Sequence, residues 1–164
     1  MKTIEELKTF FNQDFKILTE KISENSKPVF GTMDAQRMIE HMAHAFKIGN
    51  GKFQIPGSEI DPRADKLKII SLLSDRPLPK GFHNPILQKG LLPYENESLE
   101  MAKIKLFEEV ELLQKLFESN DENFTRVHNV FGRLNYHEWL WFEYKHVMHH
   151  FMQFEIIPPA ERIN

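Results

Sequence analysis

The 164-residue sequence contains no cysteine. A disulfide framework, a thiolate nucleophile and a cysteine-ligated metal site are therefore excluded from the chain itself. Any sulfur chemistry would need a small-molecule thiol. Nothing in the composition marks an oxidising compartment, and the first residues lack the apolar core of a secretion signal. We therefore expect a cytoplasmic protein.

Three further absences bear on function. The formal net charge is −3, with both signs interspersed, so the chain lacks the basic surface that nucleic acids attract. No apolar run approaches the ~18 residues that cross a bilayer. Neither a glycine-rich phosphate loop nor a nucleophile elbow occurs. These absences predict a soluble protein that acts on a small molecule, without nucleic acid or membrane as a partner.

The chain has the length of one ordinary domain, residues 1–164, and 41% of its residues are hydrophobic. Helical spacing of apolar residues predicts four helices, at about 3–24, 33–49, 97–118 and 136–155. Residues 50–95 hold six of the nine prolines and show helical spacing only around 64–73. We interpret them as an irregular crossover with one short helix, and residues 124–134 as irregular. The predicted fold is all-α, a four-helix bundle with one long crossover between the second and third helices.

The most informative stretch lies near the end of the fourth predicted helix, where His146 and His150 stand in an apolar, aromatic-rich segment. Four residues apart, two imidazoles point the same way on a helix. Histidine is the commonest metal ligand, so the pair indicates a transition-metal site. A projection at 100° per residue places Glu143 and Gln153 in the same sector. On the second predicted helix it places His41 on the apolar face, which makes His41 the natural third ligand.

Three neutral histidines leave one coordination position open, as in catalytic zinc sites. Water bound there has its pKa brought down toward ~7, and a substrate carbonyl or thiol could bind instead. Glu143 could orient a ligand or act as general base, and Gln153 could bind substrate or support a ligand. His128 is either a loop or capping residue or one that reaches the end of the bundle. His149 projects about 60° from His146, so it either supports the ligands or faces solvent.

Two other interpretations of the same residues stay open. The histidines could be core residues that bond to backbone carbonyls or to one another, although each imidazole left unmet costs about 1–3 kcal/mol. Glu143-x-x-His146 also has the spacing found in di-iron bundles, which need that motif on two helices. The second predicted helix does not supply it, because Glu40 is one residue before His41 and four before His44.

Several motifs resemble the DinB/YfiT-like superfamily of metal-binding four-helix bundles. The resemblance rests on Met38-Ile39-Glu40-His41-Met42 and on His146-x-x-x-His150-x-x-Gln153. The first is similar to the family's single histidine, and the second to its final His-x-x-x-His-x-x-Gln. Residues 128–134, followed by Trp139 and Tyr144-Lys145-His146, resemble an uncharacterised branch with a His-Pro-x-Phe-Gly loop. Asn129 stands where that branch has proline.

The resemblance implies that His41, His146 and His150 bind zinc, nickel or a similar divalent ion, and that the protein is a homodimer. Members of the family with known activity include thiol-dependent S-transferases and isomerases, and others are described as metal-dependent hydrolases. We therefore expect a metal-dependent enzyme that activates water or a low-molecular-weight thiol, with Glu143 or His128 assisting proton transfer. The alternative is a non-enzymatic metal-binding or stress-response helical bundle that acts as a dimer.

Overall fold

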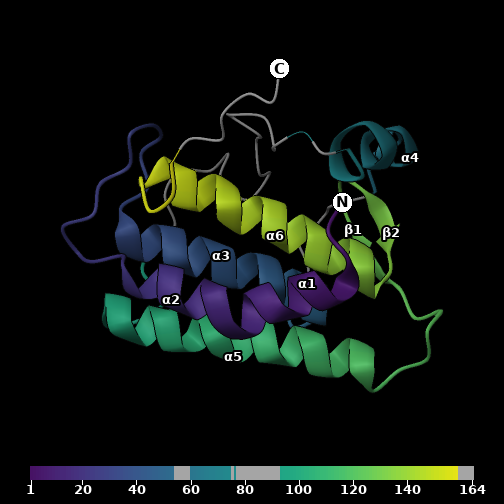
Figure 1. Ribbon diagram of the computed structural model, residues 1–164, viewed down its shortest axis with the longest axis horizontal. Helices are drawn as coiled ribbons and strands as arrows, with labels where there is room; N and C mark the ends of the chain where they lie inside the picture. The colour runs from purple at the N-terminus through teal and green to yellow at the C-terminus, as the bar shows by residue number, and fades with distance from the viewer. Residues whose placement is uncertain (54–59, 75, 77–92, 159–164) are drawn as a thin grey trace.

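The computed structural model describes residues 1–53, 60–74, 76 and 93–158, and Figure 1 shows their arrangement. Within these ranges the chain is mostly helical, as predicted, with one small two-stranded sheet. None of the described helices is long and apolar enough to cross a membrane. Much of the predicted crossover at 50–95 lies outside the described residues. Its short helix is found at α4 (Ala64–Leu67), which continues into the π-helix η2 (Lys68–Leu72).

The first predicted helix is divided by a π-helical turn. It consists of α1 (Ile4–Thr9), η1 (Phe10–Asp14) and α2 (Phe15–Glu20). The wider turn buries Phe10 and Phe11 at its start and Phe15 just after it. The ring of Phe15 lies 5.5 Å from that of Phe11 and 5.8 Å from that of Phe151. These rings fill the space between helices, and the π turn therefore sets the positions of the aromatic side chains in the core.

The three long helices begin and end close to their predicted bounds because each has a recognisable cap. Asp34 caps α3 (Ala35–Asn50), which ends at Gly51 with φ +85°. Ser98 caps α5 (Leu99–Glu118). Asn135 forms a capping box at the start of α6 (Tyr136–Gln153). In the structure α3 packs against both α5 and α6, and α1 packs against α6.

The prediction that residues 124–134 are irregular is wrong. They contain an antiparallel hairpin of β1 (Arg126–His128) and β2 (Gly132–Leu134), in which His128 pairs with Gly132. Gly132 has φ +71°, which a glycine adopts without strain. The hairpin contacts α3 and α6 and covers one end of the helices.

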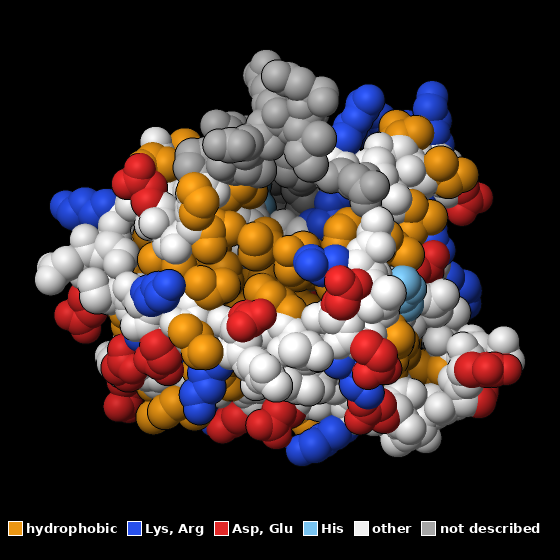
Figure 2. Space-filling view, viewed as in Figure 1, with side chains coloured by type: hydrophobic (Ala, Val, Ile, Leu, Met, Phe, Trp, Pro, Cys, Tyr) orange, Lys and Arg blue, Asp and Glu red, His pale blue; other side chains and the backbone are white. Residues whose placement is uncertain are grey.

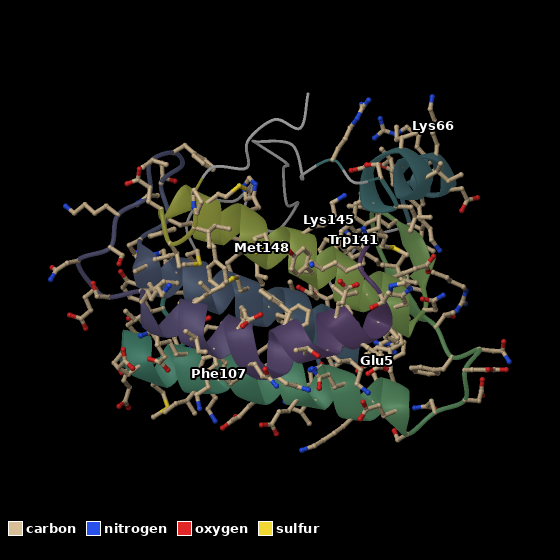
Figure 3. The ribbon with its side chains drawn as sticks, viewed as in Figure 1. Glu5, Lys66, Phe107, Trp141, Lys145 and Met148 are labelled. Carbon is tan, nitrogen blue, oxygen red and sulfur yellow. The ribbon has the colours of Figure 1, made fainter. Side chains whose placement is uncertain are left out.

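The face of α6 that carries Trp141 and Lys145 is covered by η2, and both side chains are buried. Trp141, Lys145 and Met148 project from one side of this helix (Figure 3). The Trp141 Nε1 donates to the carbonyl oxygen of Leu72 at 2.6 Å, and the Lys145 Nζ donates to that of Ser71 at 2.6 Å. Figure 2 shows hydrophobic side chains gathered near the centre of the same view, where α6 and α1 lie. The opposite face of α6 is left for the protein interior.

Candidate metal centre

The interior face of α6 carries two of the predicted ligands, and α3 carries the third. His146 and His150 lie one helical turn apart, opposite His41 near the middle of α3. The Nε2 of His146 is 2.9 Å from the Nε2 of His41 and 3.1 Å from the Nε2 of His150. One nitrogen from each residue lies within 4.8 Å of the other two. The structure thus brings together the three histidines that the sequence singles out.

The spacing of these nitrogens suits a small cation. Around a tetrahedral zinc ion with Zn–N bonds of about 2.1 Å, ligand nitrogens lie roughly 3.4 Å apart. A hydrogen bond can satisfy one of the two short contacts of His146, because a ring nitrogen carries either one proton or one lone pair. A cation at the centre would satisfy all three nitrogens at once. The donor set, three imidazoles without a thiolate, suits zinc or nickel.

Burial keeps the three imidazoles neutral. It lowers the pKa of His41 to about 4, with a smaller contribution from the nearby His44 and His149. Burial also holds the pKa of His146 and of His150 well below the usual range, and the neighbouring histidines add to the effect. At neutral pH each ring therefore has a free lone pair, which is the form that binds a metal.

Gln153 fixes which nitrogen of His150 carries the proton. The Oε1 of Gln153 lies 2.8 Å from the Nδ1 of His150, and an amide oxygen only accepts. The proton is therefore on Nδ1, and the lone pair is on the Nε2 that faces the other two histidines. The Nε2 of Gln153 donates to the carbonyl oxygen of Phe30 at 2.7 Å, which sets the orientation of the amide. Gln153 therefore fixes the orientation of the His150 imidazole.

Glu143 lies behind His146. Its carboxyl group is completely buried, and neither oxygen has a hydrogen-bond partner in the part of the chain that the structure describes. The Nδ1 of His146 lies 3.6 Å from Oε2, and it too has no hydrogen-bond partner among the described residues. Burial raises the pKa of Glu143 well above its usual range. A buried acid behind a ligand imidazole is the arrangement that orients histidine in many metal sites.

The position of Glu143 leads to two opposite expected effects of Glu143→Met. The free energy of unfolding of the metal-free protein should rise by about 1–3 kcal/mol, because an unsatisfied buried carboxyl group is replaced by an apolar chain of similar length. Metal affinity should fall by roughly 10–100-fold, because His146 loses its orienting acid. Urea unfolding with a chelator present measures the first effect, and competition with a chromophoric chelator measures the second.

Glu40 on α3 provides the matched control. It is also a buried carboxylate, but it accepts hydrogen bonds from the backbone N–H groups of Glu95 and Asn96, at 3.1 and 2.9 Å. Glu40→Met should therefore destabilise the protein, because those donors lose their acceptor. If Glu143→Met destabilised the chain as Glu40→Met does, Glu143 would be a satisfied structural residue.

The other two predicted site residues, His128 and His149, contact residues that neighbour or belong to the group of three histidines. His128, buried on β1, accepts from the backbone N–H groups of Val130 and Phe131 at 3.1 and 3.3 Å, so its Nδ1 holds the hairpin turn. Burial lowers its pKa to about 3. The ring of Phe142 lies against it, 4.5 Å away. His149 is half-buried, with its ring 5.3 Å from that of His150.

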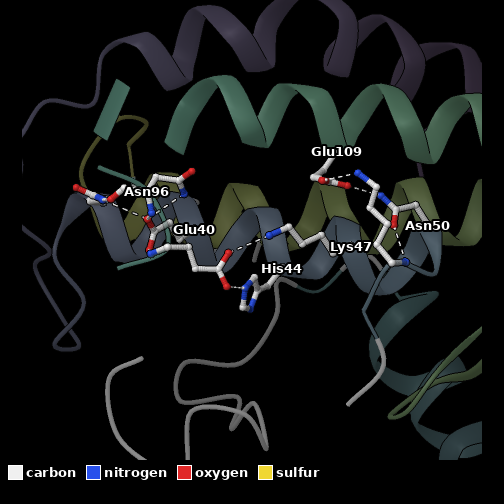
Figure 4. Close-up of polar contacts among 9 residues, drawn as sticks. Glu40, His44, Lys47, Asn50, Asn96 and Glu109 are labelled. Atoms are coloured by element: carbon white, nitrogen blue, oxygen red, sulfur yellow. Dashed lines mark hydrogen bonds and ion pairs between the residues drawn. The ribbon is translucent and has the colours of Figure 1, made fainter. Parts of the chain in front are cut away.

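A second polar cluster on α3 was missed by the sequence reasoning (Figure 4). Glu40 binds the backbone at Glu95 and Asn96, and the side chain of Glu95 bonds to His44 and, at 2.9 Å, to Lys47. The cluster holds the segment that leads into α5 against α3, the helix that carries His41. Its members on α3 are Glu40, His44 and Lys47. Their spacing of three or four residues is recognisable in the sequence as one face of a helix. Their partner, 48 to 55 residues further along, carries no such signal.

Comparisons of this chain with known protein families, with curated proteins and with solved structures find no match. The indications of what the chain does therefore lie in the three converging imidazoles and in the residues that hold them.

Proposed function

We propose that this protein is a divalent-metal-dependent enzyme in which His41, His146 and His150 hold a zinc or nickel ion. The observation that carries the proposal is the convergence of their three Nε2 atoms, two contacts of which measure 2.9 and 3.1 Å. Gln153 supports it by presenting the lone pair of His150. Glu143, which has no hydrogen-bond partner among the described residues, supports it by lying where an orienting acid is needed.

The proposed fold is a four-helix bundle of the DinB/YfiT-like type. Its four helices would be the segment from α1 to α2, then α3, α5 and α6, with the hairpin and α4–η2 as additions at one end. The family assignment is supported by the motifs around His41 and by the spacing of His146, His150 and Gln153. The homodimer, the cytoplasmic location and the small-molecule substrate stay predictions.

A bound divalent ion with three neutral ligands would supply an activated water or low-molecular-weight thiol at neutral pH. The chain's own residues set the conditions for it. The ring of Phe142 stacks on that of His146 at 5.6 Å, which makes one side of the site apolar. Glu143 faces the Nδ1 of His146, on the opposite side of the ring from Nε2. Its role is therefore to orient His146, and of the two roles predicted for it the general base is the one this position disfavours.

The test is the metal content of protein purified without a histidine tag. We expect about one zinc or nickel ion per chain, a lower melting temperature after chelation, and turnover in a panel of thiols, esters and amides that chelation removes. Substoichiometric metal together with a melting temperature that chelation does not change would contradict the proposal. Stoichiometric metal without turnover would favour the non-enzymatic bundle. Visible absorption from bound iron would favour di-iron chemistry.

A further inference from the structure

The turn between α2 and α3 approaches the metal centre at Gln153. Two hydrogen bonds join them: the backbone N–H of Val29 donates to the carbonyl oxygen of Gln153 at 2.9 Å, and the Gln153 side chain donates to the carbonyl oxygen of Phe30. Gln153 is almost completely buried and sits at the last position of α6. The turn is therefore joined to the residue whose amide oxygen accepts a hydrogen bond from the Nδ1 of His150.

Gly31 makes this close approach possible. Its φ is +81°, a left-handed conformation, and a Cβ at this position would lie 2.6 Å from the Nε2 of Gln153. Real Cβ atoms essentially never come so close to another heavy atom. The residue is exposed on its other side and is not one of the three ligands. Glycine is needed here because of the amide of Gln153.

We propose that the Phe30–Gly31 turn is a positioning element of the metal centre, acting on His150 through Gln153. The inference rests on the proposed metal site. The Phe30 carbonyl oxygen attracts the NH2 end of the amide, which leaves Oε1 for the Nδ1 proton of His150. If the amide were reversed, its NH2 group would face Nδ1. The imidazole would then have to carry its proton on Nε2, where no lone pair would remain for a metal.

Gly31→Ala is expected to weaken metal binding by roughly 10–100-fold, the usual effect of losing a residue that supports a ligand. The added methyl group displaces the far end of a flexible side chain, so the fold accommodates it by moving the amide. His150 then loses its acceptor. Competition with a chromophoric chelator measures the affinity, with zinc as the probe.

Two other glycines give matched controls. Gly51 has φ +85°, and a Cβ there would collide with the guanidinium group of Arg126. Gly132 has φ +71°, and the nearest atom to a Cβ there is that of Ala64 at 3.5 Å. Gly51→Ala therefore reproduces the strain and the collision away from Gln153, and Gly132→Ala reproduces the strain alone. Both should bind zinc as the wild type does.

A double-mutant cycle and one spectroscopic measurement test the route through Gln153. In the Gln153→Ala background, Gly31→Ala should change zinc affinity little further, because both changes remove the same support. In the metal-free protein, ¹⁵N NMR should show the His150 proton on Nδ1 in the wild type and a shift toward Nε2 in Gly31→Ala. Additive losses of affinity, or an unchanged tautomer, would overturn the inference while leaving the metal site intact.

The outcomes also separate the two proposals. A wild-type protein that binds no zinc would refute the proposed function itself. Stoichiometric zinc in the wild type with unchanged affinity in Gly31→Ala and in Gln153→Ala would refute only the role of the turn. Gln153→Ala keeps the glycine and introduces no backbone strain, so unchanged zinc affinity in this variant would overturn the inference even if Gly31→Ala did not fold.

Discussion

Replacing His146 with alanine is expected to weaken zinc binding by on the order of 10²–10³-fold, the largest effect of any single ligand. Binding free energies of about 10–16 kcal/mol for four-ligand zinc sites correspond to roughly 2.5–4 kcal/mol per ligand. His146 is the central member of the group, because its Nε2 makes both of the short contacts, at 2.9 and 3.1 Å. Its loss would leave His41 and His150 without the nitrogen that lies between them.

His137→Ala is the matched control for this experiment. His137 lies on the same helix, but its Nε2 bonds to the backbone carbonyl oxygen of Lys2 at 2.8 Å, away from the three ligands. Isothermal titration with zinc, on untagged protein, should give one site for wild type and for His137→Ala. If His146→Ala retained wild-type affinity, the convergence of the imidazoles would be a packing arrangement of core histidines.

The parts of the site that the sequence predicts are those set by a single helix. Glu143, His146, His150 and Gln153 share one face of α6 because their spacing of three or four residues matches the helical repeat. Placing His41 opposite them needs one further step, that its helix packs with its apolar face inward. Histidine, carboxylate and amide on one buried stripe are a strong signal because their burial is costly unless it serves a function.

The features that could not be predicted depend on contacts between distant residues or on very short elements. Strands β1 and β2 have three residues each, too few for an alternating pattern to appear. The π turn at η1 changes the helical repeat for only five residues. Gly31 meets Gln153 across 122 residues of sequence, and nothing local marks that glycine as part of a metal site.

The metal-free protein is expected to unfold on mild acidification, between about pH 6 and pH 4. Desolvation in the folded protein lowers the pKa values of the histidines responsible, which are His41, His128, His146 and His150. In the unfolded chain their pKa returns to about 6.5. Below that pH the unfolded chain binds protons at these histidines that the folded chain does not bind. The free energy of unfolding therefore falls as the pH falls, by up to about 1.4 kcal/mol per pH unit for each histidine.

Glu143 acts in the opposite direction. Its pKa is raised in the folded protein, so above about pH 4.5 the unfolded chain releases a proton that the folded chain keeps. Its contribution to stability therefore increases as the pH falls toward 4.5. This increase cancels the loss of stability caused by about one histidine. The remaining slope, up to about 4 kcal/mol per pH unit, would exhaust an ordinary stability of about 5–15 kcal/mol within a few pH units.

Urea unfolding at a series of pH values, with a chelator present, measures this slope, and His128→Asn assigns part of it. An asparagine Oδ1 can accept the same two backbone N–H groups in the hairpin turn, so the fold is kept while one titrating group is removed. The number of protons taken up on unfolding, which sets the slope between pH 6.5 and pH 4, should then decrease by about one. A bound ion needs neutral imidazoles, so its stabilising effect should also disappear over this range. A free energy of unfolding that stayed constant from pH 7 to pH 5 would mean that the imidazoles become protonated within the folded protein. It would contradict the prediction that they are neutral and available to a metal.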